Sequence, residues 1–240
     1  MRLTLCASML FVVGVAGVGC DGDAPAVPDA GPDAPIDAAI DAGCGLDYTG
    51  ELVDWDSNDT TFLGINAATF TVREDMTRTA MTAPNGRFML CIPDGNFAIV
   101  DVAMPADYLP GLAFAKHDVI RATGAVSMRS MTAARRDSFF AGMGVAFDPA
   151  AGQVLVHFNG TTARKAQVVA GAAATQAYNS DGAGGFVWAA GDTGLYVFFG
   201  NVPIGATANT VVTSDAAGVI GTATVPLVPG AISFVELHVP

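Results

Sequence analysis

Short stretches of alternating apolar and polar residues recur along the chain beyond residue 44. Residues 87–92 read Arg-Phe-Met-Leu-Cys-Ile, and residues 152–158 read Gly-Gln-Val-Leu-Val-His-Phe. In each stretch every second residue is a large apolar one, which is typical of a β-strand with one face buried. Asn-Gly at 85–86 is a hairpin-turn signal, and Gly or Pro separates most of the other stretches. The pattern predicts an all-β protein.

Two parts of this region show the same order of elements. In residues 44–127, Asn85-Gly86 leads into a strand that is followed by Pro93-Asp94-Gly95. In residues 145–240, Thr193-Gly194 leads into a strand that is followed by Pro203-Ile204-Gly205. A repeated order at a similar spacing indicates two tandem copies of one module.

This order of a Gly-x-Val strand, an alternating strand, a turn with a Gly-x-Phe strand, Pro-x-Gly and a further strand resembles the carboxypeptidase regulatory-like, transthyretin-like β-sandwich. The resemblance covers about residues 46–126 and 145–240, and Leu195 stands in the second copy where an aromatic residue is expected. It implies two Greek-key sandwiches of about seven strands each. Such modules are themselves non-catalytic and serve as spacers, display units or accessory domains.

Residues 128–144 connect the two parts. From 128 to 141 the segment lacks Pro and Gly and is rich in Ala, Met and Arg. This composition predicts a short helix with Thr132 as its N-cap, and Met128, Met131 and Phe139 would then pack between the modules. A continuous β-connection is the alternative.

The first 19 residues are typical of a secretory signal peptide. Arg2 is followed by a mostly apolar run that is shorter than the roughly 20 residues of a membrane-spanning helix. The run ends in Val18-Gly19-Cys20, which resembles the lipobox of bacterial lipoproteins, although Gly17 replaces the Leu that this family prefers. The resemblance implies cleavage before Cys20 and a lipid on its thiol. Cleavage by an ordinary signal peptidase is the alternative.

Residues 20–43 form an Asp-, Ala- and Pro-rich tract. Its Pro residues remove backbone donors, its Asp residues repel one another, and no aromatic residue is present to form a core. We expect a disordered tether that holds the folded region off a membrane, and an acidic tail with a binding role is the alternative. The expected location is therefore the bacterial cell envelope, with the domain facing the periplasm or the cell surface.

The charge of the chain narrows the choice of partners. The formal net charge is −12, and only 14% of the residues are charged while 51% are hydrophobic. Nucleic acid binding needs a basic patch, so nucleic acid is not an expected partner. The expected partners are the membrane, reached through the lipid, and an envelope protein or glycan.

Two cysteines, Cys44 and Cys91, lie in the expected folded region. Disulfides persist in exported proteins, and the sequence contains no Cys-x-x-Cys motif that would indicate zinc or redox chemistry. We therefore predict a bond between Cys44 and Cys91 that pins the end of the tether to the first module.

One acidic segment has the composition of a ligand site. It comprises Asp54, Trp55, Asp56, Asn58 and Asp59. Alternating oxygen ligands suit Ca²⁺, but an EF-hand is excluded because Asp59 replaces the Gly of the sharp turn and Ile65 replaces the closing Glu. A looser calcium site and a plain acidic turn remain open. Trp55, beside these acidic residues, is the candidate for stacking on a sugar.

No motif in the sequence indicates catalysis. His117, His157 and His238 are too far apart for metal-ligand spacing, and we expect them at the surface or at strand edges. No nucleophile elbow or phosphate-binding glycine loop is present. The sequence therefore favours a non-enzymatic structural, display or interaction module without cofactor or metal. The alternative is a protein that binds carbohydrate or peptide at the loop end near Trp55.

Overall fold

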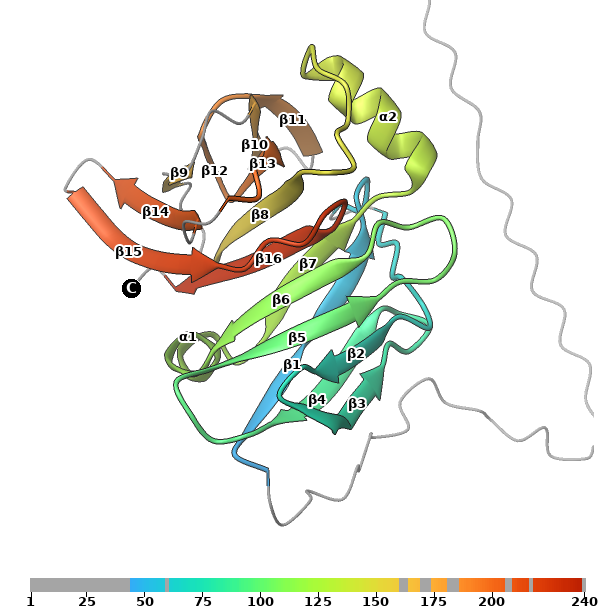
Figure 1. Cartoon of the computed structure of the whole chain (residues 1–240), viewed down its shortest axis with the longest axis vertical. Coiled ribbons are helices and arrows are strands. Elements are labelled where there is room, and N and C mark those ends of the chain that lie inside the picture. The colour runs from blue at the N-terminus through green and yellow to red at the C-terminus, as the bar shows by residue number, and fades with distance from the viewer. Residues whose placement is uncertain are drawn as a thin grey trace, which may run out of the picture. The chain divides into compact units, whose positions relative to one another are not determined.

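A computed structural model describes residues 44–58, 61–159, 164–168, 174–180, 186–205, 209–215 and 218–238 (Figure 1). The predicted signal peptide, the tether with Cys20, and Asp59 lie outside these residues. Strands dominate the described part of the chain and form three sheets. The predicted all-β class is confirmed.

A three-stranded sheet belongs to the first part of the chain. Its strands are β4 (Arg87–Ile92), β1 (Leu46–Asp54) and β7 (Val126–Ser130). The central strand β1 is antiparallel to β4 and parallel to β7. The predicted strand at 87–92 is therefore present, and its apolar face (Phe88, Leu90 and Ile92) is buried.

A nine-stranded sheet runs through both parts of the chain in the order β11-β10-β13-β8-β16-β6-β5-β2-β3. The bounds of these strands are β11 (Phe186–Ala190), β10 (Ala174–Ser180), β13 (Tyr196–Val202), β8 (Gly152–Asn159), β16 (Ile232–His238), β6 (Gly111–Lys116), β5 (Phe97–Ala103), β2 (Thr69–Val72) and β3 (Asp75–Met81).

The third sheet has four strands from the second part of the chain. Its order is β12-β9-β14-β15, with the bounds β12 (Thr193–Gly194), β9 (Arg164–Val168), β14 (Asn209–Asp215) and β15 (Gly218–Val225). Thr193-Gly194, expected to be a turn, is a two-residue strand paired with β9.

Strand β16 joins the two parts of the chain. It pairs in parallel with β6 on one side and with β8 on the other, so it lies between strands of the first and second parts (Figure 1). The two parts thus share one continuous sheet, and the described structure does not confirm two separate sandwich modules. The boundaries 44–127, 128–144 and 145–240 stay predictions.

The nine-stranded sheet has a hydrophobic core on each face. Leu155 of β8 and Phe234 of β16 belong to the core that includes the three-stranded sheet. Their neighbours Val156 and Val235 belong to a second core, which includes Ala166 of the four-stranded sheet. Because side chains alternate along a strand, the shared strands are buried on both faces.

The predicted connecting helix is present as α2 (Ala133–Gly142). Thr132 is its N-cap, and the side chain accepts a hydrogen bond from the backbone N–H of Arg135 at 3.2 Å. Met128, expected to pack beside this helix, belongs to the preceding strand β7, and Met128, Met131 and Phe139 are all buried. A second helix, α1 (His117–Thr123), follows β6. Within the described residues no helix is long and apolar enough to cross a membrane.

The aromatic side chain of Phe88 packs at the centre of the first core. Its ring stacks on Phe70 with centroids 4.1 Å apart and meets Tyr48 edge-on at 5.4 Å. Phe88→Ala removes these contacts and is expected to lower the free energy of unfolding by about 3–5 kcal/mol. The neighbouring Met89 is 41% exposed, so Met89→Ala should cost less than about 1 kcal/mol. Denaturant melts measure both, and equal losses would contradict this account of the core.

Gly86 makes the turn between β3 and β4 and has a φ of 75°. A Cβ at this position would meet the carbonyl oxygen of Leu52. The backbone N–H of Leu52 also donates a hydrogen bond to the carbonyl oxygen of Gly86 at 2.9 Å. Gly144 has nearly the same φ, 76°, but open space around the position of a Cβ.

Alanine at these two glycines separates backbone strain from steric clash. Gly144→Ala should cost about 1 kcal/mol of stability for the left-handed conformation. Gly86→Ala should cost a further ~1–3 kcal/mol because the new methyl group meets the backbone of β1. Thermal and denaturant unfolding of the two variants provide the measurement. Equal destabilisation would mean that the close approach to Leu52 is unimportant.

Candidate functional site

The acidic segment after β1 is a turn with internal hydrogen bonds. Asp54 Oδ1 accepts from the backbone N–H of Asp56 at 2.9 Å, and Asp54 Oδ2 accepts from the hydroxyl of Tyr108 at 2.8 Å. Burial, together with this hydrogen bond, raises the pKa of Tyr108 to about 12. Asn58 Oδ1 accepts from the N–H of Thr61 at 2.8 Å. These oxygens stabilise the turn rather than converge on one point.

Asp56 links the turn to helix α2. Its two carboxylate oxygens lie 2.8 and 2.9 Å from Nε of Arg135. The side chains are 52% and 33% exposed, so solvent weakens the attraction and the pair mainly orients the turn. No group of three His, Cys, Asp or Glu side chains in the described ranges is placed to hold a metal ion.

Trp55, the candidate for stacking on a sugar, is fully buried. Its ring stacks on Trp188 of β11 with centroids 4.6 Å apart and an interplanar angle of 7°. Phe139 of α2 and Phe198 of β13 meet it edge-on. These partners come from distant segments that close over the indole, so Trp55 offers no platform to a sugar. Trp188 itself is half-buried and packs against the same core.

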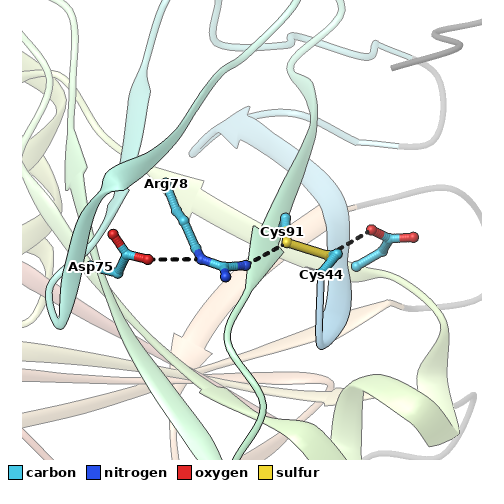
Figure 2. Close-up of a disulfide and its surroundings, with 5 residues drawn as sticks. Cys44, Asp75, Arg78 and Cys91 are labelled. Carbon is cyan, nitrogen blue, oxygen red and sulfur yellow. Dashed lines mark hydrogen bonds and ion pairs between the residues drawn. A yellow bond between two sulfur atoms is a disulfide. The ribbon is translucent and has the colours of Figure 1, made fainter. Parts of the chain in front are cut away.

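The predicted Cys44–Cys91 disulfide is confirmed (Figure 2). The Cα atoms are 5.4 Å apart, within the usual range for such a bond. Arg78 of β3 donates from Nη1 to Cys91 Sγ at 2.7 Å and from Nε to Asp75 at 2.9 Å. Sequence reasoning missed Arg78 because its contact joins β3 of the nine-stranded sheet to β4 of the three-stranded sheet, and no local pattern predicts that neighbour.

A cluster of polar side chains lies between the three-stranded and nine-stranded sheets. His157 of β8 and Glu236 of β16 are register partners, and His157 Nδ1–H donates to Glu236 Oε2 at 2.9 Å. The imidazole ring also stacks on Tyr196 with centroids 4.2 Å apart. His157 was expected to face outward, but it is largely enclosed, since its side chain is only 16% exposed.

Arg129 of β7 reaches the same cluster. Its Nη1 donates to the carbonyl oxygen of Ser57 at 2.6 Å, and the guanidinium lies 4.8 Å from the centre of the Tyr196 ring. Burial raises the pKa of Tyr196, and burial together with the negative charge of Glu236 raises that of Tyr48. Both phenols therefore stay neutral near pH 7.

The space at this cluster is small. A cavity of about 10 Å³ is lined by Tyr48, Ser127, His157 and Glu236, among others. That volume fits one water molecule at most. Within the described structure Glu236 Oε1 has no hydrogen-bond partner. The cluster can therefore order the contact between two sheets, but it cannot admit an organic substrate.

A wider and open groove follows helix α2. It has a volume of about 900 Å³ and is lined in part by Arg136, Asp137, Val145 and Phe147. Arg136 lies 4.3 Å from the centre of the Phe147 ring and pairs with Asp137 at 2.8 Å. Its lining combines charged side chains of both signs with apolar ones. Sequence reasoning did not predict this groove.

Comparisons with known proteins add little. No protein-family model and no curated protein matches the chain. One matching solved structure is the Bacillus anthracis TIE protein, with a TM-score of 0.22 and 11% sequence identity over 80% of this chain. This chain covers 33% of that protein's length.

His117, expected at the surface, is a buried residue at the start of α1. It is 2% exposed, and neither ring nitrogen has a hydrogen-bond partner within the described structure. Burial lowers the pKa of His117 from the ordinary value of 6.5, and Arg121 lowers it further, while Asp94 and Asp118 act in the opposite direction. The folded state therefore favours the neutral ring.

This burial predicts a pH dependence of stability. Below about pH 6.5 His117 binds a proton more readily in the unfolded chain than in the folded chain, because burial lowers its pKa in the folded state. The free energy of unfolding should therefore fall as pH falls. His117→Phe should reduce the slope between pH 6.5 and 5. His238→Gln, at an exposed histidine, is the control and should leave it unchanged. Denaturant melts across this pH range measure the slope. An unchanged slope in His117→Phe would show that His117 does not cause the pH dependence.

Proposed function

We propose that this protein is an exported, non-enzymatic lipoprotein of the bacterial cell envelope that acts as a structural, display or interaction module. The observation that supports export best is the Cys44–Cys91 disulfide, because disulfides persist in oxidising compartments outside the cytoplasm. The apolar run that ends at Cys20 supports a lipid anchor through its resemblance to the lipobox.

The arrangement of the candidate ligand residues favours a structural role. Asp54 accepts from the Tyr108 hydroxyl, Asp56 pairs with Arg135, and Trp55 is enclosed by other aromatic rings. Each side chain is engaged in holding the end of β1 against helix α2 or the sheets. The alternative of a sugar site at Trp55 loses its stacking surface, since this ring is fully buried.

The entry of the tether into the domain suits an anchored protein. The segment that contains Cys20 joins the described structure at Cys44, and the disulfide fixes this point to β4. Strand β1 begins two residues later and lies between β4 and β7. A pull on the tether would therefore be shared by the disulfide and by hydrogen bonds to two neighbouring strands.

The likeness of both parts of the sequence to carboxypeptidase regulatory-like sandwiches agrees with a spacer or display role. In this proposal the partners are the membrane, reached through the lipid, and an envelope protein or glycan. The strand-rich domain supplies the surface for that second contact. Neither a cofactor nor a metal ion is part of the proposal.

Replacement of Cys20 tests the anchor. In a bacterial host with lipoprotein processing, the wild type should partition with membranes and carry a diacylglycerol at Cys20, as seen by intact-mass analysis. Cys20→Ala should lose the lipid mass and at least about tenfold of the membrane-bound fraction, because the acyl chains supply the membrane affinity. Cys6→Ala, within the predicted signal peptide, is the control and should behave as wild type. A wild-type protein without lipid at Cys20 would refute the anchor.

A further inference from the structure

The two sulfur atoms of the disulfide lie in unequal electrostatic surroundings. Arg78 Nη1–H donates to Cys91 Sγ at 2.7 Å, whereas Asp47 Oδ1 lies 3.4 Å from Cys44 Sγ (Figure 2). A cation therefore contacts one end of the bond and an anion the other. Both cysteines are partly exposed, so a small thiol can approach them.

Arg78 is held in position by its own partners. Its Nε donates to Asp75 Oδ2 at 2.9 Å, and Asp75 Oδ1 also accepts from the hydroxyl of Thr77 at 2.6 Å. These hydrogen bonds lower the pKa of Asp75, which stays ionised at neutral pH. The guanidinium is thus fixed between a carboxylate and the sulfur of Cys91, with a side chain that is 24% exposed.

We propose that the Cys44–Cys91 disulfide is a thiol-exchange site with a fixed direction, in which an external thiolate attacks Cys44 and Cys91 leaves. A bond forms between the incoming sulfur and Cys44 Sγ while the Cys44–Cys91 bond breaks. The electron pair of the broken bond remains on Cys91 Sγ as a thiolate beside Arg78. The sulfur of the external thiol is oxidised as it enters the mixed disulfide with Cys44, and the sulfur of Cys91 is reduced to the thiolate, so the number of disulfide bonds does not change.

The direction follows from the stability of the leaving sulfur. Exchange is faster when the departing thiol is more acidic, and a neighbouring cation makes a thiol more acidic. Arg78 therefore favours negative charge on Cys91, while Asp47 opposes it on Cys44.

Repulsion between Asp47 and an incoming thiolate acts against this reaction but is the weaker effect. Asp47 is exposed, so water and salt screen its charge. The N–H of Arg78 contacts the departing sulfur directly, and such a charge-assisted hydrogen bond is little screened.

The consequence is a covalent attachment point at a defined place. A thiol bound to Cys44 would sit where segment 1–43 meets β1, while the backbone pairing of β1 with β4 and β7 remains. Exchange would also break the covalent link between Cys44 and β4, so that segment 1–43 would be held to the domain only through the start of β1. The exchange depends only on residues of the folded domain and does not require a lipid at Cys20.

Peptide mapping of the oxidised full chain tests the direction. The protein is incubated briefly with glutathione at pH 7, quenched with acid, and free thiols and mixed disulfides are located by mass spectrometry. Most early product should carry glutathione on Cys44 and a free thiol on Cys91. Glutathione found chiefly on Cys91, or equally on both cysteines, would overturn the proposal. This test needs only the wild-type protein.

Two arginine variants test the cause. Arg78→Gln should slow the exchange by about tenfold and even out the two products. Arg87→Gln removes the same charge from an exposed position on strand β4 and should change the rate less than twofold. In the reduced proteins, the alkylation of Cys91 by iodoacetamide should shift to higher pH only in Arg78→Gln. Equal behaviour of the two variants would overturn the role of Arg78.

Discussion

The parallel pairing of strand β16 with both β6 and β8 is the constraint on which the fold depends. Six of its seven residues are buried, and its side chains enter the cores on both faces of the nine-stranded sheet. Parallel partners cannot be joined by a tight turn, so the pairing of β16 with β6 requires most of the chain to be in place. Loss of this strand would expose the edges of β6 and β8 and separate the two parts of the sheet.

The polar cluster makes the register of β16 specific. Glu236 lies opposite His157 in the β16–β8 pairing, and Tyr48 and Arg129 approach from the three-stranded sheet. A shift of one residue would turn the Glu236 side chain toward the opposite, apolar core. Because an unpaired buried charge is costly, these contacts disfavour other registers even if they add little net stability.

The disulfide gives the domain a second constraint, at the opposite end of the chain. It fixes Cys44 to β4 before β1 begins, and Arg78 of the edge strand β3 contacts it from the side. One local arrangement therefore serves two roles. It attaches the N-terminal segment firmly to the domain, as the proposed anchor requires, and it gives the two sulfur atoms different chemical surroundings.

The sequence by itself determined the features that depend on neighbouring residues. Alternation at 87–92 and 152–158, the turn at Gly86 and the capping of α2 by Thr132 are local, and all are present. The disulfide was predictable because Cys44 and Cys91 are the only cysteines in the folded region.

Only the tertiary structure decided the burial of Trp55, the contact of Arg78 with Cys91 and the place of β16 between the two parts. Each joins residues that are distant in sequence. Alternation shows which side of a strand is apolar, but it does not show which strand will lie beside it or what will cover its end. The side chain of Trp55 is buried because helix α2 and strands β11 and β13 close over it, and no local pattern encodes that closure.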